Sequence, residues 1–591
     1  MPSSNQFHRE QITTHLKRSR LLKKKLVISS TLRGILFIAL LTAMYFAYPN
    51  AKLVIGLLVM GVVLFLILVT RHDNIKSKRR LHQKIITLSE MELRGLKGDF
   101  STFSGGKEYK NAHHYFSHDI DLFGDHSFFQ QVNRTGLPKG GKVLANLITS
   151  NAVENIKEKQ NVVKELAAIP EWRQLFTAHA QLVQPEESPE RILKWLREYT
   201  FFTPKFTKAL VYGFSAVSVA LLIGYWADVL PGKYPLIWFF IGFGISGRYF
   251  AKVNAISSRT SKAQSTFRQY YQLIALVEQQ EFKSNPLKDQ REKIISTSKK
   301  ASAILKSFAK RLDELDQRNN FLIGIFGNAF LLRDLYKAHQ IEHWIKMHRD
   351  KVAQWFDVIP FFDAYNSLAN YAFNHQNYTY PIIVNDHTVI KAVQLVHPMI
   401  DPAVAVRSNF HINTGEFFIT TGANMAGKST FLRTVGLHIV MANVGLPVCA
   451  EKSHYHPIKL ITSMRTTDSL TDDASYFFSE LKRLQFITEE IQKDRYFIIL
   501  DEILKGTNST DKAEGSAKFV EKLVQSKSTG IIATHDLSLC KTAEKFDRVK
   551  NYYFDAVIKN DELYFDYTLK EGVCSNMNAS FLMKKMGIVD H

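Results

Sequence analysis

The segment Gly422–Thr430 has the residue types and spacing of a phosphate-binding loop. It follows the apolar run Phe417–Ile419, reads G-x-x-x-x-G-K-S, and leads into a stretch compatible with a helix. Glycines at these positions permit a tight turn that directs backbone N–H groups at phosphate oxygens. Lys428 would neutralise the β- and γ-phosphate charge, and Ser429 would be a ligand of Mg²⁺. The predicted nucleotide-binding residues are Gly422, Ala423, Asn424, Met425, Ala426, Gly427, Lys428, Ser429 and Thr430.

Two later apolar runs end in residues that suit phosphate chemistry. The run that begins at Tyr496 ends in Asp501 and Glu502, and Gly530–Ala533 is followed by Thr-His535. The carboxyl ends of buried parallel strands are where α/β sheets bind ligands. We expect Asp501 to be a second Mg²⁺ ligand, Glu502 to polarise the attacking water, and His535 to sense the γ-phosphate. The pattern predicts an ATPase that uses ATP and Mg²⁺.

Length and cysteine usage limit the class of protein. A chain of 591 residues exceeds a single hydrophobic core, so several domains are expected. The three cysteines, Cys449, Cys540 and Cys574, are widely scattered, which suits a reducing compartment and predicts neither a disulfide framework nor a zinc site.

The first part of the chain combines positive charge with long apolar runs. Residues 1–110 hold 19 Lys and Arg against 6 Asp and Glu, in a chain of formal net charge +21. The runs Gly34–Tyr48 and Leu53–Thr70 are about long enough for a transmembrane hairpin, and basic residues on both flanks place both ends in the cytoplasm. A nucleic-acid-binding arm, a buried helical pair and a signal peptide are the alternatives. The positive charge brackets apolar stretches, which argues against a nucleic-acid-binding arm. The apolar runs lack a polar helix face, which argues against a buried helical pair. They also lack a cleavage pattern, which argues against a signal peptide.

A second pair of apolar runs follows at Ala209–Trp226 and Tyr234–Gly247, again between basic flanks. Four spans are expected, and a two-span chain with an interfacial or re-entrant second pair is the alternative. The predicted location is the cytoplasmic membrane, multi-pass, with the N-terminus and the ATPase domain in the cytoplasm. Residues from about 253 to 375 carry apolar positions at helical spacing, and short β-rich runs begin near Tyr378.

The complete loop, Thr421–Thr430, resembles that of the MutS family of DNA mismatch-repair ATPases, which characteristically reads T-G-x-N-M-x-G-K-S. The Asn424-Met425 pair separates it from a generic nucleotide site. Further matches in the last third of the chain occur in the family's order: His397-Pro398, Asp501-Glu502-Ile503, Lys505-Gly506-Thr507, Ser509-Thr510-Asp511 and Thr534-His535.

The resemblance also implies a homodimer through the ATPase domains. Asp473–Leu481 is similar to the family's S-T-F-x-x-E-M signature, so Ser475 would reach across the dimer to the γ-phosphate of the other subunit. The composite site would take Lys428 and Glu502 from one protomer and Ser475 from the other. Neither half alone would supply enough donors to stabilise the transferred phosphoryl group.

Departures from the family are equally informative. The front of the chain lacks the mismatch-reading domain with its F-x-E wedge, and the F-x-E at Phe519–Glu521 falls in a predicted helix, where we expect it to be structural. Asp536 stands where the family usually has an aromatic residue. Residues from about 120 to 200 show a fainter resemblance to the start of the family's helical core.

The predicted fold is multi-domain: transmembrane helical hairpins and a mostly α-helical core, followed by an α/β P-loop ATPase domain of ABC/MutS type. The predicted segments are a basic cytoplasmic arm (1–33), a first transmembrane hairpin (34–70), a helical region resembling the start of the MutS core (71–206), a second hairpin (207–250), a helical core or lever region (251–377) and the ATPase domain (378–591).

The resemblance implies a membrane-anchored ATPase coupled to mismatched or damaged duplex DNA. The alternative is an ABC-like mechanochemical ATPase that acts on a membrane or protein partner without DNA. A transporter ranks third, because the apolar runs contain no obvious polar residues to form a substrate path.

Overall fold

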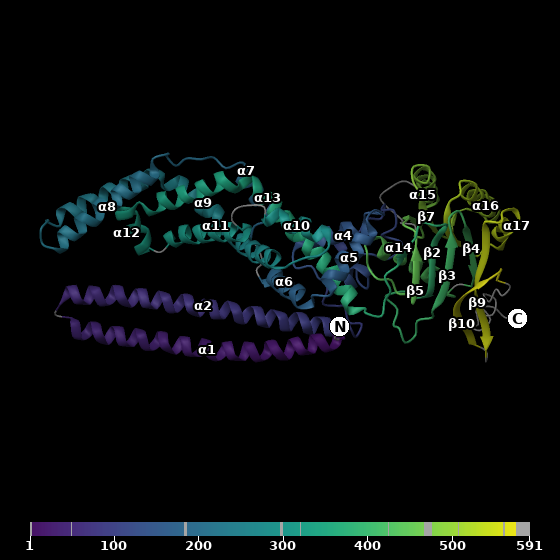
Figure 1. Cartoon of the computed structure of the whole chain (residues 1–591). Helices are drawn as coiled ribbons and strands as arrows, with labels where there is room; N and C mark the ends of the chain where they lie inside the picture. Colours follow the sequence, from purple (N-terminus) through teal and green to yellow (C-terminus); the bar gives the residue numbers. More distant parts are fainter. Residues whose placement is uncertain are drawn as a thin grey trace. The chain divides into compact units, whose positions relative to one another are not determined.

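The computed structural model describes residues 3–48, 50–182, 186–295, 300–319, 321–423, 425–465, 476–505, 507–559 and 562–574. The chain divides into two compact units (Figure 1). Unit 1 comprises Met1–Phe7, Met91–Pro170 and Ala364–His591, and unit 2 comprises His8–Glu90 and Glu171–Asp363.

Unit 2 is helical because its segments carry apolar residues at helical spacing with few internal breakers. In α11, for example, Ile304, Leu305, Phe308 and Leu312 are buried on one face. Four of the helices, α1, α2, α6 and α13, belong partly to unit 1, α6 by its first residue alone. The helices are α1 (Ser4–Ala47), α2 (Ala51–Gly95), α6 (Pro170–Leu182), α7 (Pro189–Arg197), α8 (Thr207–Trp226), α9 (Lys233–Gln279), α10 (Asn285–Ile295), α11 (Ala301–Asp316), α12 (Phe321–Leu331) and α13 (Arg333–Asn374), with a 3₁₀ turn at Gln317–Asn319.

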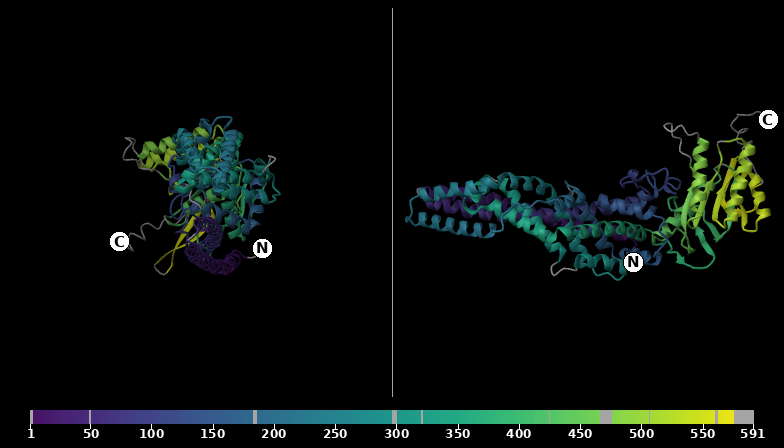
Figure 2. Two further views of the ribbon diagram at one scale, coloured as in Figure 1. Left: turned by 90° about the vertical axis from the view of Figure 1, so that its left-hand side faces the viewer. Right: turned by 90° about the horizontal axis from the view of Figure 1, so that it is seen from above.

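Four of these helices, α1, α2, α8 and α9, are long and apolar enough to cross a membrane by length and composition. Helices α1 and α2 lie side by side (Figures 1 and 2). His15 and His82 face each other with their Nδ1 atoms 2.8 Å apart, and His72 Nδ1 lies 3.3 Å from Ser29 Oγ. Burial lowers the pKa of His15 to about 4, and burial also lowers the pKa of His82.

Unit 1 contains two sheets with helices packed on them. In the larger sheet the described strands run in the order β10-β9-β4-β8-β7-β6, all parallel except β10, which pairs antiparallel with β9. The smaller sheet has the order β1-β5-β2-β3. The strands are β1 (Ile382–Ile383), β2 (Thr388–Leu395), β3 (Ser408–Asn413), β4 (Phe417–Gly422), β5 (Lys452–Tyr455), β6 (Lys459–Ser463), β7 (Tyr496–Asp501), β8 (Thr529–Ala533), β9 (Val549–Lys559) and β10 (Glu562–Glu571).

The helices of unit 1 are α3 (Phe128–Val132), α4 (Pro138–Thr149), α5 (Ile156–Ala167), α14 (Lys428–Asn443), α15 (Tyr476–Glu490), α16 (Ser509–Gln525) and α17 (Thr542–Lys545), with 3₁₀ turns at Lys107–Tyr109 and Leu537–Lys541. Strands β4, β7 and β8 are largely apolar and almost wholly buried, as expected of parallel strands covered on both faces. Their carboxyl ends therefore meet at one edge of the sheet.

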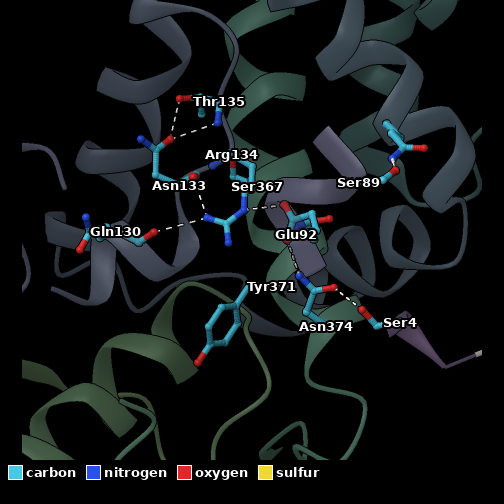
Figure 3. Close-up of polar contacts among 12 residues, drawn as sticks. Ser4, Ser89, Glu92, Gln130, Asn133, Arg134, Thr135, Ser367, Tyr371 and Asn374 are labelled. Carbon is cyan, nitrogen blue, oxygen red and sulfur yellow. Dashed lines mark hydrogen bonds and ion pairs between the residues drawn. The ribbon is translucent and has the colours of Figure 1, made fainter. Parts of the chain in front are cut away.

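A buried polar cluster joins the start of α1 and the end of α2 to the end of α13 within unit 1 (Figure 3). Glu92, at the end of α2, accepts hydrogen bonds from Arg134 Nε (2.6 Å), Asn370 Nδ2 (3.0 Å) and Asn374 Nδ2 (2.8 Å). Ser4, at the start of α1, donates to Asn374 Oδ1 at 2.6 Å. The Arg134–Glu92 ion pair is nine-tenths buried, so each charge depends on the other.

Candidate nucleotide site

The phosphate-binding loop joins β4 to α14 and is set by its backbone. Gly422 has φ 145°, and a Cβ there would lie 2.5 Å from the carbonyl oxygen of Phe554, so only glycine fits. Gly427, directly before α14, has φ 104°, and Met425 has φ 67°. The free N–H groups of the first turn of α14 therefore face the loop, which makes the helix N-terminus an anion site.

Lys428 is buried at the start of α14, with 5% of its surface exposed. Its Nζ donates hydrogen bonds to the backbone carbonyls of Gly422 (2.7 Å) and Ala423 (2.8 Å). Burial lowers its pKa, while the nearby carboxylates of Glu502 and Asp501 act in the opposite direction. The ammonium is poorly hydrated and its hydrogen-bond partners are neutral carbonyls. A charge-assisted hydrogen bond to a phosphate would therefore stabilise it strongly.

Ser429 and Asp501 bring two oxygens together below the loop. Ser429 Oγ, in the first turn of α14, donates to Asp501 Oδ2 at 2.6 Å, and Asp501 is the last residue of β7. A hydroxyl and a carboxylate oxygen are hard donors of the kind that Mg²⁺ takes from proteins when phosphates and waters complete its shell. The donor set therefore fits Mg²⁺.

Glu502 and His535 form a pair beside Lys428. His535 Nε2 donates to Glu502 Oε1 at 2.8 Å, and Lys428 Nζ lies 3.3 Å from the same nitrogen. This hydrogen bond lowers the pKa of Glu502 to about 2, with Lys505 contributing to the same shift. A carboxylate with so low a pKa is ionised throughout the neutral range and orients or polarises a water more readily than it keeps a proton.

Backbone strain accompanies this pair. Glu502 has φ 51° and Leu504 has φ 59°, conformations that residues other than glycine rarely adopt. Glu480 of α15 holds the strained segment, because its buried carboxylate accepts the backbone N–H groups of Leu504 (2.6 Å) and Lys505 (3.0 Å). Sequence reasoning assigned no role to Glu480, although it is the glutamate of the Asp473–Leu481 signature.

A pocket of about 620 Å³ lies next to the loop. Its lining includes the polar residues Lys428, Ser429 and Glu502 together with a larger number of apolar residues. Tyr567 of β10 lies over Gly427, with Cδ1 3.1 Å from where a Cβ would be. Sequence reasoning left the base-side contacts open. The remaining lining of the pocket includes Leu395, Val396, His397, Ile400, Val404, Ala405, Val406, Phe431, Phe554 and Tyr567.

The structure thus brings most of the predicted site residues to one sheet edge, where Lys428, Ser429, Asp501, Glu502 and His535 meet. Asn424 and Ser475 lie outside the described residues. The F-x-E at Phe519–Glu521 falls within α16, as the sequence predicted.

This arrangement defines a P-loop nucleotide-binding domain: a buried parallel strand, a glycine loop ending in Lys-Ser, a helix, and acids on the neighbouring strand ends. The sequence profile of MutS domain V matches residues 418–586. Human MutS protein homolog 4 is 31% identical over 193 residues, covering 31% of this chain and 20% of that protein.

Two bacterial proteins named DNA mismatch repair protein MutS match over longer stretches. The one from Thermotoga maritima is 28% identical over 265 residues, covering 44% of this chain and 32% of its own length. The one from Persephonella marina is 30% identical over 244 residues, covering 40% and 28%. Residues 418–586 therefore match a domain of the MutS family, and the C-terminal part of the chain is similar to these relatives at modest identity. It matches only about a fifth to a third of the length of these relatives.

Proposed function

We propose that the protein is a membrane-anchored MutS-family ATPase that binds and hydrolyses ATP at a dimeric composite site. The observation that carries this proposal is the convergence of Lys428, the Ser429–Asp501 pair and the Glu502–His535 pair on one pocket next to a glycine loop.

Each side chain has a role that follows from its chemistry. The loop N–H groups and Lys428 bind the β- and γ-phosphates and draw negative charge away from the transferred group. Ser429 and Asp501 would hold Mg²⁺, which would neutralise part of the phosphate charge. Glu502 orients the attacking water, and His535 fixes the rotamer of Glu502 and keeps it ionised.

The dimer and the membrane complete the proposal. Family resemblance supports a homodimer in which Ser475 of one protomer serves the site of the other. Four long apolar helices support a multi-pass anchor in the cytoplasmic membrane, with the N-terminus and the ATPase domain on the cytoplasmic side. Under this proposal the domain boundaries are those predicted from the sequence.

Two relatives are named for DNA mismatch repair, so we propose that mismatched or damaged duplex DNA regulates the ATPase. The second candidate is an ABC-like mechanochemical ATPase that acts on a membrane or protein partner without DNA, and the four apolar helices favour it.

The test is the ATPase rate of purified full-length protein in lipid nanodiscs, measured with no DNA, homoduplex and mismatched duplex at fixed salt, since basic segments bind any duplex. Stimulation by mismatched over homoduplex DNA is expected, and no response to either duplex would favour the second candidate. Lys428→Ala is the control for both, because it should lose nucleotide binding whatever the partner.

A further inference from the structure

Helix α12 is apolar over its whole length, with the sequence FLIGIFGNAFL, and is too short to cross a bilayer. Eleven residues of α-helix extend about 16 Å, whereas the hydrocarbon core is about 30 Å thick. The helix is not an ordinary core element either. Phe326 and Leu331 are 53% and 46% exposed, while Ala329 is fully buried.

Helix α12 packs on α9 inside the apolar window Tyr234–Gly247, through the buried Ala329 and also through one side of the half-exposed Phe326. The ring of Phe239 contacts Phe326 and Phe330, with centroids 6.3 Å and 5.8 Å apart. Ser246 Oγ donates to the carbonyl oxygen of Asn328 at 3.2 Å. A Cβ at Gly242 would lie 2.0 Å from the carbonyl oxygen of Ala329, so the two backbones touch there.

The contacts of Gly242 and Ser246 fall in the half of the α9 window that is nearest to Arg248 and Lys252, and Phe239 lies just before its midpoint. Arg248 and Lys252 are both exposed, and basic residues after a span mark its cytoplasmic end. Helix α12 is therefore level with the cytoplasmic half of the proposed second hairpin.

Both ends of α12 return to one level. Arg318, before the helix, pairs with Asp334, after it, at 3.1 Å, and both side chains are 7% exposed. Arg318 also lies over the ring of Phe250, just past the apolar window of α9. A chain that enters and leaves at the same level does not cross.

Asn328 satisfies one backbone group inside α12 and one at the turn after it, as a nonpolar solvent favours. Asn328 donates from Nδ2 to the carbonyl oxygen of Gly324 at 2.8 Å and accepts the N–H of Asp334 on Oδ1 at 2.9 Å. Leu332 is buried against Val211 and Phe214 of α8.

We infer that α12 is a re-entrant helix whose exposed face, carrying Phe326 and Leu331, is covered by acyl chains of the cytoplasmic leaflet. This inference rests on the membrane anchoring proposed above. It adds a lipid-contacting element to the region that the sequence assigns to a soluble helical core.

The test uses full-length protein in which Cys449, Cys540 and Cys574 are replaced by alanine. A fluorophore is attached to a single introduced cysteine, the protein is reconstituted in liposomes, and depth-dependent quenching of the fluorophore by brominated lipids is measured. The probe site is Phe326→Cys. Phe240→Cys, 64% exposed on α9, reports a span, and Lys194→Cys, exposed on α7, reports water.

Quenching of Phe326→Cys to about the level of Phe240→Cys, with none at Lys194→Cys, is expected. Quenching at Phe240→Cys alone would overturn the α12 inference and leave the anchor intact. Absence of quenching at Phe240→Cys as well would overturn the anchor itself, so the two failures are distinguishable.

Two further measurements sharpen the result. Lys310→Cys and Met347→Cys flank the segment and are exposed; an impermeant maleimide should label both only from the cytoplasmic side, and labelling from opposite sides would mean that the segment crosses. Gly242→Val should displace α12 and change quenching at Phe326→Cys, whereas Gly244→Val, with open space at its Cβ, should not. Equal effects of the two valines would contradict the packing contact.

Discussion

Two glutamates of unit 1 have opposite environments. Glu92 is nine-tenths buried and accepts hydrogen bonds from three side chains on two different segments, one of them a guanidinium at 2.6 Å. Glu502 is 25% exposed, receives one close hydrogen bond from His535, and lines a pocket of about 620 Å³.

The difference separates a structural carboxylate from a reactive one. Every donor around Glu92 belongs to the fold, so its charge is used to hold the ends of α2 and α13 together. Glu502 keeps acceptor capacity directed at a pocket that also contains an ammonium and a hydroxyl, and its backbone is strained at φ 51°. Substitution of the first should therefore cost stability, and substitution of the second should cost turnover.

Glu502→Gln should give the largest loss of activity. The amide keeps the size of the side chain but loses the charge that polarises water, so the steady-state ATPase rate should fall by about 10²–10⁴-fold. ATP should still bind, because Lys428 and the loop are intact. Nucleotide binding by equilibrium fluorescence and turnover by phosphate release are measured on the same protein, and a wild-type rate would remove Glu502 from its proposed role.

Glu92→Ala should act on stability alone. The substitution leaves Arg134 buried without its partner, at a cost of about 3–5 kcal/mol, read as a lower midpoint of thermal unfolding. ATP turnover per folded molecule should be unchanged. Glu514→Ala is the matched control, because the Lys518–Glu514 pair is exposed and should contribute less than about 1 kcal/mol. Equal midpoints for the two variants would contradict the structural role of Glu92.

The two glutamates also differ in how far the sequence revealed them. Glu502 is the second acid after an apolar strand, and its role follows from that position together with the loop, so the sequence predicted it. Glu92 is one of several charged residues near the end of a long helix, and its partners at Arg134, Asn370 and Asn374 are 42 to 282 positions away. No local pattern encodes such contacts.

The same reasoning applies to the rest of the molecule. The parallel strands and the acidic residues at their carboxyl ends were predictable, because each strand is a local apolar run that ends in polar residues. The apolar lining of the pocket was not, because it is assembled from β2, the loop after it, α14, β9 and β10. Helix α12 was not singled out within the predicted helical region 251–377, since an apolar run of eleven residues fits a buried helix as well as a membrane-facing one.

His535→Ala should have the smallest of these effects and the clearest pH dependence. Removing a hydrogen bond to a charged group costs about 1.5–3 kcal/mol, so turnover should fall about 10- to 100-fold at neutral pH. Without the donor, the pKa of Glu502 should rise from about 2 towards its ordinary value of 4.5.

The sign of the pH effect follows from this shift. A depressed carboxyl pKa stabilises the folded protein fully above the ordinary value of 4.5, and that contribution is lost as pH falls through about 2. His535→Ala should therefore lower the unfolding midpoint at pH 6, and its midpoint should approach that of the wild type as pH falls below 4.5. Its turnover should also decline at a higher pH than that of the wild type on the acid side. Parallel acid limbs and a constant difference in midpoint would mean that His535 does not set the ionisation of Glu502.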